Sequence, residues 1–191
     1  VFESVFRKSL RPNNYVHGTA TYSVRIGEFE FAVEGVMYCA QNGITNSCAQ
    51  VALRSLLTRR DPSNDFPYSK INLSAGIPGN GCLTDKNGQE IPPGLQFDEI
   101  CTCLDDLKVA YSPMPYVDDN DNRIPENEEE HNYEWWLYAG VESGEGALLV
   151  FNTADSDRHA IPVFGHTFNE DAWAGRARQF YFTVGTTKYL M

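Results

Sequence analysis

A cysteine stands where a polar turn passes into an apolar helix, in the segment QNGITNSCAQVALRSLL (residues 41–57). Asn46 and Ser47 are residue types that cap helix N-termini, and leucine and valine side chains follow at helical spacing, so Cys48 is predicted to lie in the first turn of a helix. Backbone N–H groups at that end favour an anion, and the thiolate is the form of cysteine that attacks a carbonyl carbon. The competing interpretation is a buried cysteine that only packs.

A cysteine nucleophile needs a base that takes its proton and a third group that orients the base. His159 and His166 are the histidines of the C-terminal strand region, and Asn169 and Asp171 follow within a dozen residues. Seven residues along one strand separate the two histidines, which puts them on opposite faces, so only one of them can point at Cys48. Each histidine is also consistent with a strand residue that only packs or faces solvent.

The composition excludes several classes of partner. The 191 residues carry 26 acidic and 15 basic side chains, for a net charge of −11, which argues against nucleic acid or an anionic membrane as the main partner. No run approaches the roughly twenty apolar residues of a membrane span, and the N-terminus lacks the order of a signal peptide. We therefore expect a soluble protein of one domain, residues 1–191, without membrane insertion.

The five cysteines are an odd number and form no CxxC pair, which weakens both a zinc site and a complete disulfide framework. A reducing, cytoplasmic location is favoured over secretion. The chain begins at Val1 and stops just after a strand-like run, so we expect it to be excised from a longer chain or trimmed, with a neighbouring domain as one possible partner.

An acidic segment, residues 117–131, places oxygen side chains at the spacing of a calcium-binding EF-hand loop (Asp118, Asn120, Asn122, Glu126 and Glu129). Arg123 occupies the position that needs glycine, and Pro125 follows it. A solvated acidic loop is therefore the prediction, a calcium-loop protein is the weakest alternative, and neither a metal nor a cofactor is expected.

The elements that position these residues are expected in the order strands, helix, loop, helix, loop, helix and then several strands. Residues 1–15 show no clear period and are expected to form an arm or a short helix, and residues 61–94 are expected to be irregular. The remaining segments are predicted to be strands (20–26, 29–38, 146–152, 158–166, 178–184) or helices (46–60, 95–109, 131–144). This order is typical of an α+β fold in which helices pack on a largely antiparallel sheet.

Three short motifs, NSCAQVAL around Cys48, then ESGEGALLVFN, then RHAIPVFG, together resemble the papain-like cysteine peptidase superfamily. The closest pattern is that of the compact bacterial, bacteriocin-processing type. The resemblance implies a central helix that carries the cysteine against a mostly antiparallel sheet. It also implies a cysteine peptidase or related thiol hydrolase that cleaves a peptide or amide bond of a polypeptide through an acyl-enzyme.

The resemblance also implies a role for each site residue. Cys48 is the nucleophile, His159 is the general base, and Asn169 or Asp171 orients the imidazole. Gln41, with the Cys48 backbone N–H, donates to the oxyanion. Two choices stay open at this point: Asn42 can replace Gln41, and His166 competes with His159. Two alternative functions also remain, a catalytically inactive papain-like binding module and an acyltransferase on the same fold.

Overall fold

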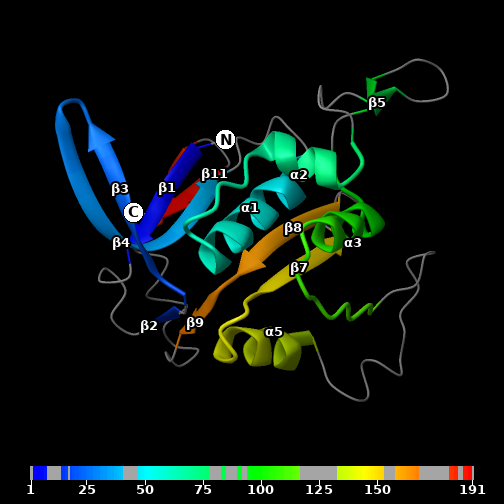
Figure 1. Cartoon of the computed structure of the whole chain (residues 1–191). Helices are drawn as coiled ribbons and strands as arrows, with labels where there is room; N and C mark the ends of the chain where they lie inside the picture. The colour runs from blue at the N-terminus through cyan, green and yellow to red at the C-terminus, as the bar shows by residue number, and fades with distance from the viewer. Residues whose placement is uncertain are drawn as a thin grey trace.

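The computed structural model describes eleven stretches of the chain: residues 2–7, 14–16, 18–40, 47–77, 83–84, 90–91, 94–116, 133–152, 158–167, 181–184 and 187–190. They contain helices and antiparallel strand pairs (Figure 1), so the predicted α+β class is confirmed. No helix in these stretches is long and apolar enough to cross a membrane.

The N-terminal sheet has three strands in the order β1 (Phe2–Arg7), β4 (Phe29–Ala40) and β3 (Ala20–Ile26). The predicted hairpin is present, and its tight turn begins at Gly27, whose φ of 62° suits glycine. The expectation of an arm or a helix for residues 1–15 is wrong for β1, which pairs with β4 from Phe2↔Ala40 to Arg7↔Gly35. Cross-strand pairing therefore decides the conformation of this segment, which shows no period of its own.

The central helix α1 (Cys48–Arg60) begins at the predicted cysteine. It contacts β4 on one side and the strand pair β7 (Ala147–Asn152) and β8 (Arg158–Val163) on another. Its apolar side chains share one core with two further helices, α2 (Tyr68–Ser74) and α3 (Phe97–Asp106). Leu53, Ile71 and Cys103, one from each helix, are fully buried there.

Helix α2 corrects the expectation that residues 61–94 are irregular throughout. Pro67 occupies the N-cap position, and burial of Ile71 in the core stabilises the short helix that follows. Helix α3 confirms the prediction for residues 95–109 in its central part. Its first turn has a capping box, in which the Gln96 backbone N–H donates to the Glu99 carboxylate at 2.7 Å.

The C-terminal half supplies helix α5 (Tyr133–Glu142) and the predicted strands, all in antiparallel pairs. The long strand expected at residues 158–166 is divided at Phe164 into β8, which pairs with β7, and β9 (Gly165–Thr167), which pairs with β2 (Asn14–Val16). Two further pairs complete the described part: β5 (Leu83–Thr84) with β6 (Glu90–Ile91), and β10 (Tyr181–Val184) with β11 (Thr187–Leu190).

Candidate functional site

Cys48 is the first residue of α1, and Ser47 occupies the N-cap position as predicted. The Val51 backbone N–H donates to the Ser47 carbonyl at 3.0 Å, which closes the first turn. Cys48 is partly buried and packs against the core that contains Ala49 and Ala160. The thiol therefore lies at the positive end of a 13-residue helix dipole and is neither fully buried nor fully exposed.

The other thiols in the described part differ from Cys48. Cys39 and Cys103 are buried free cysteines, and Cys101 is a partly buried one within α3. Burial raises the pKa of the Cys103 thiol to about 11, and the charge of Asp106 adds to the effect. Among these four cysteines, only Cys48 combines partial exposure with a helix N-terminus.

Helix α1 lies against β8, and the C-terminal ends of the two elements lie together (Figure 1). At its C-terminal half, Leu56 Cδ2 and the Val163 carbonyl oxygen each lie 3.2 Å from the position of a Cβ built on Gly146. Cys48 lies about 12 Å along the helix from Leu56, towards the N-terminus. His159 lies about 13 Å along the strand from Val163, also towards the N-terminus. Cys48 and His159 thus lie at the same end of the α1–β8 unit.

The side chain of His159 belongs to a definite face of the β7–β8 pair. Its Cα partner is Phe151, and the two rings meet edge to face with centroids 5.7 Å apart. Its neighbour Ala160 is buried in the core with α1. Because successive strand residues point to opposite faces, the imidazole lies on the face that α1 does not cover. The structure brings His159 to the level of Cys48, with its ring turned towards Phe151.

His166 lies at the other end of the unit. Its Nε2 is 2.5 Å from Glu142 Oε1, and its ring contacts that of Tyr138, with centroids 5.1 Å apart. Seven residues of extended chain span up to about 23 Å, so His166 sits near α5, far from the level of Cys48. Of the two histidines, His159 is the one at the level of Cys48, although its ring lies on the face of the strand pair that α1 does not cover.

The other predicted site residues, Gln41, Asn169 and Asp171, lie outside the described residues, as does the acidic segment 117–131. Within the described stretches there is no group of three or more His, Cys, Asp or Glu side chains arranged to hold a metal ion.

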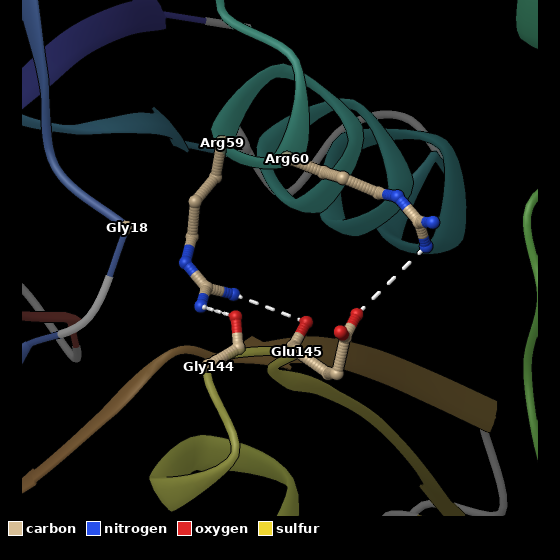
Figure 2. Close-up of a pocket in the computed structure, with 5 residues that line it drawn as sticks. All are labelled: Gly18, Arg59, Arg60, Gly144 and Glu145. Carbon is tan, nitrogen blue, oxygen red and sulfur yellow. Dashed lines mark hydrogen bonds and ion pairs between the residues drawn. The ribbon is translucent and has the colours of Figure 1, made fainter.

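A pocket of about 210 Å³ that sequence reasoning missed lies at the C-terminal end of α1 (Figure 2). Arg59 lines it and is only 5% exposed, and its guanidinium donates to the carbonyl oxygens of Gly144 at 2.6 Å and Glu145 at 3.2 Å. Arg60 Nη1 lies 3.8 Å from a Glu145 carboxylate oxygen. The pair of arginines at the end of a helix was the available signal, since basic side chains often bind carbonyl groups near helix C-termini. Here the guanidinium fastens α1 to the turn before β7.

No protein-family model, no curated protein and no solved structure matches the chain. Its function is therefore inferred from its own residues and their geometry.

Proposed function

We propose that this chain is a thiol hydrolase with a papain-like fold, in which Cys48 attacks a peptide or amide carbonyl of a polypeptide. The observation that carries the proposal is the position of Cys48, a partly exposed thiol at the first residue of α1, at the same end of the α1–β8 unit as His159. The thiol, the helix dipole and a histidine at one end of a helix–strand pair are the parts that thiol acylation requires.

In the proposed reaction, the Cys48 thiol loses its proton to His159, and its sulfur bonds to the substrate carbonyl carbon. The Cys48 backbone N–H and the Gln41 side chain stabilise the oxyanion. The carbon–nitrogen bond then breaks, and the leaving amine takes the proton from His159. Water adds to the thioester, releases the carboxylic acid and restores the thiol. Asn169 or Asp171 orients the imidazole.

The proposal requires the His159 ring to reach the α1 side of β8. A slip of one residue in the pairing of β7 with β8 would move every side chain of β8 to the other face. The present contact of His159 with Phe151 favours a second candidate, a binding module that retains the fold without a working base. The two candidates differ in what they predict for the reactivity of Cys48.

The test is the rate of iodoacetamide labelling at each cysteine at pH 7, read by peptide mass spectrometry. Cys101 is the internal standard, because it is partly buried like Cys48 but lies inside a helix. The hydrolase predicts that Cys48 labels at least about tenfold faster than Cys101, since a general base typically contributes a hundredfold or more.

Two matched histidine variants complete this experiment. His159→Ala should remove the advantage of Cys48, whereas His166→Ala should leave it unchanged. Equal labelling of Cys48 and Cys101 in the native chain would reject the hydrolase and leave the binding module.

A further inference from the structure

The β3–β4 hairpin extends beyond β1, the strand that pairs with the end of β4 away from the turn (Figure 1). Strand β1 pairs with β4 only from Gly35 onwards, so residues 29–34 of β4 pair, in the described part of the chain, with β3 alone. Beyond that point the hairpin has two strands and a turn at Gly27. An isolated two-stranded hairpin is marginally stable in water, so this projecting part depends on its anchored base or on a partner.

One face of the projecting hairpin is apolar along its whole length. We call it the apolar face; it consists of three cross-strand pairs: Tyr22↔Val33, Val24↔Phe31 and Ile26↔Phe29. Tyr22, at its base, packs against the core residues around Met37. Exposure then rises towards the tip, to 49% for Phe31 and 72% for Phe29. The aromatic side chains are thus most exposed where the hairpin is least anchored.

The opposite face of the same two strands is polar. Its side chains include Ser23, which donates to Glu30, and Glu34, which accepts from the Thr19 hydroxyl at 3.3 Å. Arg25 lies across from Glu30 in the register. The hairpin is therefore amphipathic, and its apolar face is oriented away from the side that these hydrogen bonds occupy.

Strand β3 is also an edge strand, because the three-stranded sheet of the described residues ends with it. An exposed edge with apolar side chains is a template for another strand, and proteins normally blunt such edges. A strand added beside β3 would form backbone hydrogen bonds with it and extend the apolar face by one row of side chains.

We infer that this hairpin binds an extended segment of another polypeptide, which adds to the edge of β3. The segment has apolar residues at alternate positions, where they lie beside Tyr22, Val24 and Ile26. It has basic residues at its ends, because Glu28 lies in the turn at the tip and Glu34 near the base. Arg25, in the middle of the polar face, disfavours a basic residue beside it. The net charge of −11 steers a basic segment towards the chain.

Area favours such a segment over a second copy of the chain stacked on the apolar face. The three most exposed side chains of the apolar face, Ile26, Phe29 and Phe31, at 66%, 72% and 49% exposure, together present on the order of 350 Å² of apolar surface. A stable interface between folded proteins buries roughly 800 Å² on each partner. The apolar face is therefore too small for a stable interface with a second folded copy stacked on it.

The probe is a fluorescein-labelled peptide of sequence KKVTVTVTVKK, titrated with the whole chain and followed by fluorescence anisotropy. We expect saturable binding that weakens at least about tenfold in Ile26→Thr, since Ile26 is the most exposed of the apolar β3 side chains that lie directly beside the added strand. Ala32→Thr, on the polar face of β4, is the matched control and should change the affinity less than about twofold. Both positions are exposed and threonine suits strands, so equal circular dichroism spectra should accompany these changes.

Two further probes test the strand addition itself. One is N-methylated on the valine positions and the other on the threonine positions. Only one of these alternating sets faces β3, so one probe should fail to bind and the other should bind as the parent does. A peptide with lysine at its central threonine should bind more weakly than one with glutamate there.

The inference is overturned by any of three results: no saturable binding of the parent peptide, equal binding of both N-methylated probes, or a dimer in sedimentation that Phe29→Thr dissolves. Binding should persist in Cys48→Ala, so its failure is distinguishable from failure of the proposed hydrolase.

Discussion

A methyl group placed beside the buried Arg59 guanidinium tests the contact between α1 and the turn before β7. The change is Gly146→Ala, compared with Arg59→Met and with the double variant. Gly146 has a φ of 74°, and a Cβ built there would collide with the Arg59 guanidinium. That guanidinium donates to the carbonyl groups of Gly144 and Glu145. A methyl group at position 146 must therefore displace it.

The contacts set the size of the effect. Each hydrogen bond from a charged group contributes about 1.5–3 kcal/mol, so Arg59→Met should lower the free energy of unfolding by about 3 kcal/mol. Gly146→Ala should cost about 1 kcal/mol for the left-handed φ and about 2 kcal/mol more for the displaced guanidinium. With Met at position 59 there is no guanidinium to displace, so the double variant should lose about 4 kcal/mol. This is about 2 kcal/mol less than the sum of the two single losses, and the difference is the coupling free energy.

Urea unfolding, followed by circular dichroism at 222 nm, measures these four free energies. Gly76→Ala is the matched control, because Gly76 has a φ of 77° and no atom of the described residues lies within 4 Å of its built Cβ. It should show the cost of the left-handed φ alone. Additive losses in the double variant, or equal losses in Gly146→Ala and Gly76→Ala, would refute the reasoning.

Two further predictions concern titratable groups. Burial raises the pKa of Cys103 in the folded chain to about 11 from an ordinary 9.0, so the contribution of the protonated thiol to stability is complete below pH 9 and is lost as the pH rises towards 11. Cys103→Ala should therefore reduce the decrease of the urea midpoint between pH 9 and pH 11. An equal decrease in the native chain and in Cys103→Ala would contradict this explanation. Glu142→Gln, which removes the charge beside His166, should cost less than about 1 kcal/mol, because both side chains are partly exposed. It should leave iodoacetamide labelling of Cys48 unchanged, and a slower rate would bring His166 back as the base.

The local signals in the sequence predicted several elements well. The residue types at Asn46 and Ser47 and the apolar spacing after them predicted that α1 begins close to Cys48, although the Ser47 side chain forms no capping hydrogen bond. Gly27 between alternating residues predicted the β3–β4 hairpin. Both are short-range features, in which neighbouring residues decide the conformation. The strands β7 and β8 were predicted from the apolar runs in their own sequences, which are also a local signal.

Features that depend on distant partners were not predictable. Strand β1 has no period of its own and forms because β4 pairs with it. The face on which His159 lies follows from its register with Phe151, and a shift of one residue would reverse it. The enclosure of Arg59 needs Gly18 and Gly146, which lie far from it in the sequence and close to it in space. In each case a long-range contact, absent from any local pattern, decides the outcome.

The most direct test of the proposed hydrolase is to trap the acyl-enzyme. The chain is mixed with an activated thioester of a short peptide, quenched in acid after seconds, and digested for mass spectrometry. The proposal predicts that the peptide with Cys48 gains the mass of the acyl group, that hydroxylamine removes it, and that His159→Ala forms it at least about a hundredfold more slowly. An acyl group that appears on Cys101 as readily as on Cys48, or at the same rate in His159→Ala, would contradict it.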